Sequence, residues 1–223
     1  MSDSLPESSL KVLADAGSGR VFIILFDDEG YRSLAHAIAA QLVEKVRAVV
    51  VSSPPVDARS WEPLSESLSS LIQSLSIRQA SFIGLGAGAT LAQNISLVYP
   101  KVVRTLAVVD STSRPHPTRW ERLVDRLEAR LPFGLPLRLG NRGFNVRSYL
   151  HRLRCPLLVV STSRASSFIR AELDSLAALA PTAWHVNVTE DDPAREAISL
   201  SSTLLAFYDT PAKCPQKNIG VAV

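Results

Sequence analysis

The residues whose types and spacing could do chemistry lie in the middle of the chain, at Gly84-Leu85-Gly86-Ala87-Gly88. An apolar stretch typical of a buried β-strand precedes them, and a helical pattern begins directly after them. In a strand-to-helix turn of the form G-x-S-x-G, the central serine is an exposed nucleophile held at positive φ, and the flanking glycines relieve crowding between helix and strand. Gly86 occupies the central position here, so the sequence predicts the turn without its hydroxyl group.

The same glycines fit a second pattern, the dinucleotide-binding fingerprint G-x-G-x-x-A, through Gly84, Gly86 and Ala89. Asp110 ends the next expected strand, about 20 residues further on, where a ribose-binding acid would belong. Against this interpretation, the motif follows several expected strands, whereas the dinucleotide fingerprint usually opens its sheet. Dinucleotide binding is therefore the second alternative.

Three segments around the turn resemble the α/β-hydrolase superfamily. LSESLSSLIQSLSIRQASFIGLGAGATLAQNISLVYPKVVRTLAVVDST is similar to the family's helix, elbow strand, elbow helix and next strand. RLRCPLLVVST resembles the strand before the catalytic acid, and AWHVNVTEDDPAREAISLSSTLLAFY resembles the closing strand and helix. The resemblance extends from Leu10 to Tyr208 and implies a mostly parallel sheet of about seven strands, helices on both faces and a short cap insertion.

The positions that carry catalysis in that family hold other residues here. The nucleophile position is Gly86, the acid position falls near Ser163 or Arg164, and the histidine position falls near Glu190 or Asp191. Loss of the nucleophile or the base of a serine triad typically lowers turnover about a millionfold. The resemblance therefore implies a hydrolase fold without serine-type hydrolysis.

The loop that supplies oxyanion donors in the family usually reads His-Gly, and here it reads Asp27-Asp28-Glu29-Gly30. Carboxylates that face a developing oxyanion repel it. Glu190 and Asp191 come from a second loop that this fold would place at the same carboxyl edge of the sheet. We expect the ligand-binding residues to be Asp27, Asp28, Gly86, Ala87, Glu190 and Asp191. The alternative is that the acids are loop and helix-cap residues.

These observations predict a pseudo-hydrolase that binds a small apolar molecule or a protein partner. A glycine at the nucleophile position also occurs in the NDR (N-myc downstream-regulated) family, whose G-x-G-x-G-A pattern is similar to residues 84–89 here. The first alternative is a divergent hydrolase or esterase-like enzyme with relocated catalytic residues, for which the acidic loops or His116 are the candidates. No cofactor or metal ion is expected, because no two of the four histidines have the spacing of metal ligands.

Composition argues against other classes of protein. The formal net charge is only +3, and the basic residues alternate with acids, so a nucleic-acid interface is not expected. The polar N-terminus does not resemble a secretory signal, and no run reaches the roughly 18 apolar residues of a membrane span. We therefore expect a cytoplasmic protein. Cys155 and Cys214 form neither a disulfide framework nor a metal-ligand pair, and we expect Cys155 to be buried.

Apolar runs and helical patterns alternate along the chain, which predicts a single α/β domain over residues 1–208, with a cap-like insertion at 114–154 and an extended tail at 209–223. DAGSG predicts a hairpin turn between the first two strands, and Asp192 is expected to cap the last helix. The expected strands are 10–13, 21–26, 47–51, 80–83, 104–109, 156–160 and 183–188; the expected helices are 33–45, 62–76, 89–98, 166–180 and 193–208.

Overall fold

The computed structural model of the protein describes residues 10–27, 29–54, 61–112 and 146–209. Seven strands form one sheet in the order β1-β3-β2-β4-β5-β6-β7. All neighbouring strands run parallel except β1, which is antiparallel to β3. The strands are β1 (Lys11–Ala16), β2 (Val21–Phe26), β3 (Arg47–Ser52), β4 (Ala80–Leu85), β5 (Val103–Val109), β6 (Leu157–Thr162) and β7 (Ala183–Val188).

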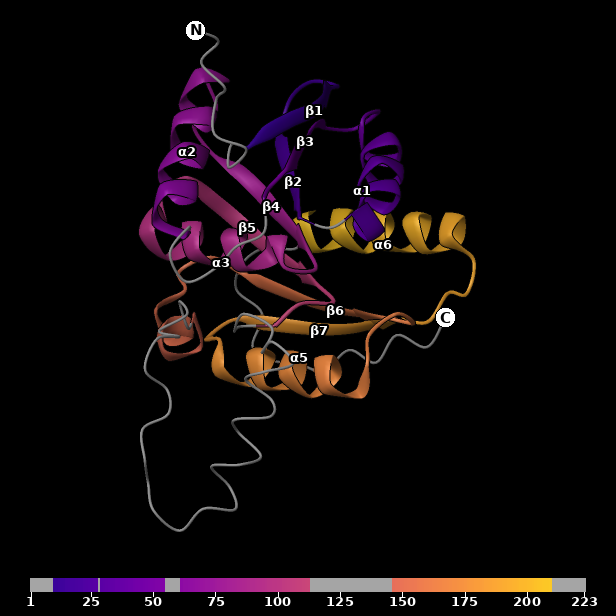
Figure 1. Ribbon diagram of the computed structural model, residues 1–223. Helices are drawn as coiled ribbons and strands as arrows, with labels where there is room; N and C mark the ends of the chain where they lie inside the picture. The colour runs from indigo at the N-terminus through magenta and orange to yellow at the C-terminus, as the bar shows by residue number, and fades with distance from the viewer. Residues whose placement is uncertain (1–9, 28, 55–60, 113–145, 210–223) are drawn as a thin grey trace, which may run out of the picture.

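Helices cover both faces of this sheet (Figure 1). They are α1 (Glu29–Leu42), α2 (Trp61–Ser74), α3 (Gly88–Val98), α5 (Ser167–Leu179) and α6 (Pro193–Asp209), together with the 3-10 helix η1 (Val146–Arg152). Successive residues of a strand point to opposite faces, so a strand covered on both sides must be apolar throughout. The sequence VFIILF of β2 satisfies this requirement, and its last five residues are buried. The predicted mostly parallel sheet of about seven strands, with helices on both faces, is confirmed.

The core consists of two apolar clusters, one on each face of the sheet. Phe22 and Ile24 of β2 point into the cluster formed with α1 and α6. Ile23 and Leu25 point to the other face, into the cluster formed with α2, α3, α5 and η1. Cys155 is buried in this second cluster, as predicted. Helices α1 and α6 thus lie side by side on one face (Figure 1).

The hairpin predicted between the first two strands is wrong, although the predicted antiparallel edge is correct. Strand β3 lies between β1 and β2, and β1 pairs with it rather than with β2. The turn still needs its glycines, since Gly17 and Gly19 have φ of +87° and +84°. A Cβ on Gly17 would lie only 2.1 Å from the carbonyl oxygen of Val46. The turn therefore packs closely against the start of β3 rather than closing a hairpin.

The start of the first helix also differs from the prediction. Helix α1 begins at Glu29 rather than at Ser33, so Glu29-Gly30, which the sequence places in a loop, is helical. Glu29 lies in the first turn, where a carboxylate interacts favourably with the helix dipole, and it accepts a hydrogen bond from Arg32 at 3.0 Å. This earlier start brings Tyr31 into the helix and over the sheet edge.

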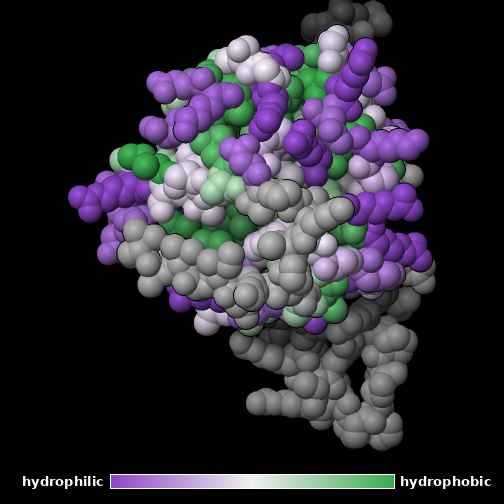
Figure 2. Space-filling view, turned by 180° about the vertical axis from the view of Figure 1, so that it is seen from behind, coloured by the Kyte–Doolittle hydropathy of each residue, from purple (hydrophilic) through white to green (hydrophobic). Residues whose placement is uncertain are grey.

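Several predicted features lie outside the described residues: Asp28, His116, most of the 114–154 insertion and the tail beyond Asp209. Of the insertion, only the part from η1 onward is described. No helix in the described ranges is long and apolar enough to cross a membrane. In the view from behind, polar residues cover much of the described surface and apolar residues show between them (Figure 2).

Candidate functional site

The turn from β4 to α3 has the backbone geometry that the sequence predicts. Gly86 has φ of +56°, in the left-handed region that glycine tolerates best. A Cβ on Gly84 would lie 2.2 Å from Cα of Ala89, and one on Gly88 would lie 2.6 Å from Cα of Phe26. Both contacts are with backbone, which cannot move aside. The flanking glycines therefore allow α3 to start directly against the sheet, as in a nucleophile elbow.

The space above Gly86 is occupied by the ring of Tyr31, from the first turn of α1. A Cβ on Gly86 would lie 2.7 Å from Cε2 and 3.0 Å from Cδ2 of that ring. Real Cβ atoms do not approach carbon so closely, so any side chain at position 86 would have to displace the tyrosine. The sequence did not predict this contact, because it depends on where α1 begins. Tyr31 thus fills the space in which a nucleophile would project.

Arg164 lies at the position expected for the catalytic acid. Its side chain is 34% exposed, and Nη2 donates a hydrogen bond to Oε2 of Glu196 at 2.9 Å. Nη1 donates a longer hydrogen bond, of 3.4 Å, to the carbonyl oxygen of Gly30. The neighbouring Ser163 hydroxyl donates to the carbonyl oxygen of Glu190 at 3.0 Å. Arg164 therefore links α1 to α6 through these two hydrogen bonds.

Glu196 is a buried charge that the sequence interpretation missed. It lies in the first turn of α6, and its side chain is only 2% exposed. Its spacing did contain a signal, because Glu196 shares one face of the helix with Ala197, Leu200 and Leu204, all of which are buried. A carboxylate on the apolar face of an amphipathic helix must find a partner inside the protein. Arg164 is that partner.

Asp110 ties together the ends of β5 and β6. It is 1% exposed and has φ of +47°. Its Oδ1 accepts a hydrogen bond of 2.7 Å from the backbone N–H of Thr162, and its Oδ2 accepts one from the Thr162 hydroxyl. Burial raises the pKa of Asp110, while these hydrogen bonds and the charges of Arg164 and Arg170 act in the opposite direction. With both oxygens engaged inside the protein, Asp110 is poorly placed for binding a ribose.

The remaining predicted site residues have diverse surroundings. Asp27 is half-buried just after β2, and Ala87 is half-buried just before α3. Glu190 is half-buried and Asp191 is exposed. Asp192 caps α6 as predicted, with carboxylate oxygens 3.4 Å from the backbone nitrogens of the second and third residues of the helix. Within the described part of the chain, no three His, Cys, Asp or Glu side chains gather into a metal site.

Comparison with known proteins identifies the fold. No family model matches the sequence, and no curated protein matches it either. Solved structures do match: an esterase from Thermogutta terrifontis has 16% identity and a TM-score of 0.68 over 89% of this chain and 94% of its own. An enol-lactonase from Burkholderia xenovorans has 17% identity and a TM-score of 0.65 over 89% and 95%. A hydrolase from Pseudomonas aeruginosa has 17% identity and a TM-score of 0.63 over 90% and 94%. The chain has the α/β-hydrolase fold.

Proposed function

We propose that this protein is a pseudo-hydrolase, a non-catalytic α/β-hydrolase-fold protein that binds a small molecule at the carboxyl edge of its sheet. The observation that carries the proposal is the contact between Gly86 and Tyr31, because the ring fills the space of the missing nucleophile. Hydrolysis through an acyl-enzyme needs a nucleophile, a base and an oriented acid. The elbow supplies the nucleophile in such enzymes, and here its central residue is Gly86, which has no side chain.

The surroundings of the elbow support the same conclusion. Arg164 replaces the acid, and the loop that should carry the histidine contains Glu190 and Asp191 instead. Among the described histidines, His185 pairs with Asp174 of α5 at 3.1 Å, and His36 and His151 are exposed. We therefore expect that none of these three histidines activates a serine placed at position 86.

The test is a search for hydrolysis and for an activated nucleophile. We expect the purified protein to show no turnover of a panel of p-nitrophenyl esters and no labelling by a fluorophosphonate probe. The variants Gly86→Ser and Gly86→Ser/Tyr31→Ala should also be inactive, because restoring the hydroxyl and its space restores neither base nor acid. Robust turnover by the native protein, or labelling of one defined residue, would contradict the proposal.

The second candidate is a divergent hydrolase with relocated catalytic residues. The names of the similar structures, which include an esterase and an enol-lactonase, favour keeping it. A single labelled residue in the fluorophosphonate experiment, identified by peptide mass, would support this candidate and name its nucleophile. Loss of turnover on alanine substitution of that residue would complete the case.

A further inference from the structure

We propose that Glu196 is the recognition group for a small molecule bearing a guanidinium cation, and that Arg164 occupies the place of that cation in the unliganded protein. The inference rests on the proposed non-catalytic binding function and specifies the chemistry of its ligand. The evidence is the ion pair between Arg164 and Glu196. Glu196 is almost completely buried, whereas Arg164 is partly exposed, and the two side chains differ in how many of their polar atoms are hydrogen-bonded.

The carboxylate of Glu196 has an unused hydrogen-bonding atom. Its side chain is 2% exposed, Oε2 accepts one hydrogen bond from Arg164, and Oε1 is buried without any hydrogen-bond partner. A buried carboxylate normally accepts several hydrogen bonds, because solvent no longer supplies them. Glu196 can therefore accept a further donor from a ligand and gain from it.

The side chain of Arg164 can move out of the ion pair more readily than that of Glu196. It belongs to the loop between β6 and α5, its side chain is 34% exposed, and one of its two hydrogen bonds is 3.4 Å long. A partly exposed guanidinium recovers its hydration when it turns outward. The carboxylate of Glu196 lies on the buried face of α6 and cannot reach solvent by turning outward. A competing cation would therefore displace Arg164 and leave Glu196 in place.

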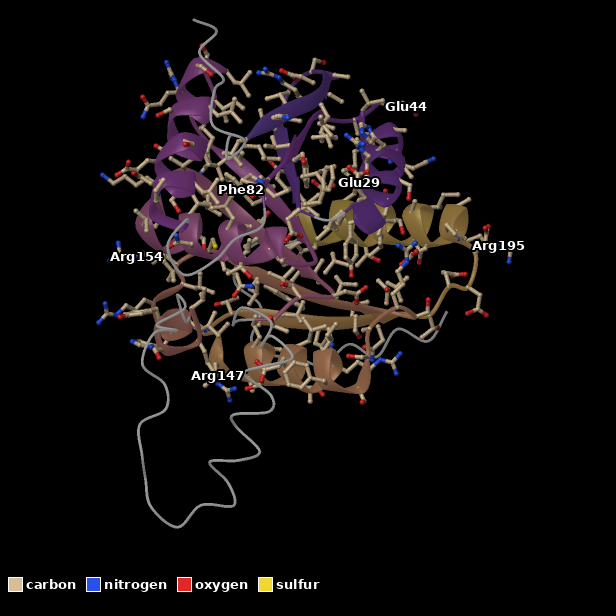
Figure 3. The ribbon with its side chains drawn as sticks, viewed as in Figure 1. Glu29, Glu44, Phe82, Arg147, Arg154 and Arg195 are labelled. Carbon is tan, nitrogen blue, oxygen red and sulfur yellow. The ribbon has the colours of Figure 1, made fainter. Side chains whose placement is uncertain are left out.

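The pair lies beside the degenerate elbow. Arg164 also donates to the carbonyl oxygen of Gly30, and the next residue, Tyr31, covers Gly86. Glu29 begins α1 close to α6, whereas Arg195, next to Glu196, projects away from the sheet (Figure 3). A ligand that replaces Arg164 would reach the same Gly30 carbonyl. It would thus contact the segment that holds Tyr31 over the elbow.

The geometry favours a guanidinium over other groups. Two nitrogens of the Arg164 fork already donate to two acceptors, Oε2 of Glu196 and the oxygen of Gly30, which matches a planar guanidinium. An anion would face the buried carboxylate, and a neutral group would leave its charge uncompensated. A metal ion is not favoured, because the described residues contain no group of three suitable ligands.

The experiment removes the guanidinium group of Arg164 by mutation and supplies methylguanidine in solution. Methylguanidine is titrated into Arg164→Ala, and melting temperature and calorimetric binding are measured. At about ten times Kd, we expect methylguanidine to raise Tm by about 3–6 °C. N-methylurea, which has a similar shape but no charge, should produce no shift. The native protein should bind methylguanidine more weakly than Arg164→Ala, because its own arginine competes.

The matched control is Arg147→Ala. Arg147 is 35% exposed and pairs at 3.6 Å with Glu172, which is 13% exposed, in a contact between η1 and α5. Methylguanidine should stabilise this variant no more than it stabilises the native protein, and it should not stabilise Arg164→Ala/Glu196→Gln. Equal stabilisation by N-methylurea, an equal effect in the double variant, or no binding to Arg164→Ala would overturn the inference. If Arg164→Ala does not fold, methylguanidine must instead shift the amide resonances of Gly30 and Gly86 in the native protein.

These outcomes separate the inference from the proposed function. Ester turnover by the native protein would contradict the pseudo-hydrolase itself. Absence of turnover together with absence of methylguanidine binding would leave the pseudo-hydrolase standing and remove only the cationic ligand.

Discussion

The turn between β4 and α3 and the loops after β6 and β7 lie at the same edge of the sheet, yet different features define them. The turn is defined by its backbone, with Gly86 at φ of +56° and close-packed glycines on either side. The loops are defined by their charges, because Arg164 follows β6, and Glu190 and Asp191 follow β7. These are the positions near which the family resemblance places a catalytic acid and histidine.

The physical reason for this difference is what each region has to satisfy. The elbow is constrained by close backbone contacts, since a Cβ on Gly84 would overlap Ala89. The loops after β6 and β7 have freedom in side-chain type, provided that every buried charge finds a partner. Glu196 forms an ion pair with Arg164 of the loop after β6. Asp110, at the end of β5, accepts a hydrogen bond from Thr162 at the end of β6. Four predictions test this contrast.

The largest effect is expected from Gly84→Ala. The new Cβ would lie 2.2 Å from Cα and 2.6 Å from Cβ of Ala89, and α3 cannot retreat without losing its packing. Overpacking of this severity should lower the free energy of unfolding by about 3 kcal/mol or more. The control is Gly19→Ala, which meets nothing within 4 Å and should cost only the strain of φ +84°, about 1–2 kcal/mol. Urea denaturation of both variants measures the difference, and equal losses would refute the packing account.

The second prediction compares two ion pairs. Arg164→Met leaves Glu196 charged and buried, which should cost about 2–4 kcal/mol after allowing for the partial exposure of the arginine. Arg47→Met breaks a pair with Asp15 in which both side chains are nearly 30% exposed, and it should cost about 1 kcal/mol or less. Chemical denaturation measures both. A larger loss for Arg47→Met would show that burial of Glu196 is not the deciding factor.

The third prediction concerns the contact between the β4–α3 turn and helix α1. Gly86→Ala should be destabilising, because its Cβ would meet the Tyr31 ring at 2.7 Å and the residue has positive φ. Tyr31→Ala removes the ring, so the double variant should be more stable than the sum of the single losses predicts. We expect a coupling of about 1–2 kcal/mol in a double-mutant cycle. Strict additivity would mean that Tyr31 does not restrict position 86.

The smallest effect is a dependence of stability on pH. Burial raises the pKa of Asp110 above its unfolded value of about 3.9, so the folded state binds this proton more tightly. Its contribution to stability is complete below that unfolded value and is lost as pH rises through the folded pKa. Asp110→Asn should remove this loss. Asp15, whose pKa is lowered by its hydrogen bond with Arg47, contributes in the opposite direction and loses stability as pH falls.

Thermal unfolding of the native protein and of Asp110→Asn, measured from about pH 3 to pH 7, tests this sign. The stability of Asp110→Asn relative to the native protein should increase as pH rises, and an increase as pH falls would contradict a raised pKa. Asp15→Asn serves as the comparison with opposite slope.

The sequence alone determined most of the helices and strands, the mostly parallel sheet and the glycine-rich turn between β4 and α3. Runs such as VFIILF and LLVVST require cover on both faces, and closely spaced glycines between a strand and a helix permit only a tight turn. The apolar strands and the glycine turn are local features of the chain. Side-chain alternation and φ preference depend only on residues that are adjacent in the sequence. The tight turn with glycine at position 86 could therefore be recognised without a structure.

Tertiary structure alone decided what fills that position and how the buried charges are matched. Tyr31 reaches Gly86 only because α1 begins at Glu29, and Arg164 meets Glu196 across 32 residues of chain. Strand β1 pairs with β3 instead of β2, and the sequence does not indicate which strand lies beside which. Such contacts depend on distances between segments far apart in sequence, and neither periodicity nor residue type encodes those distances.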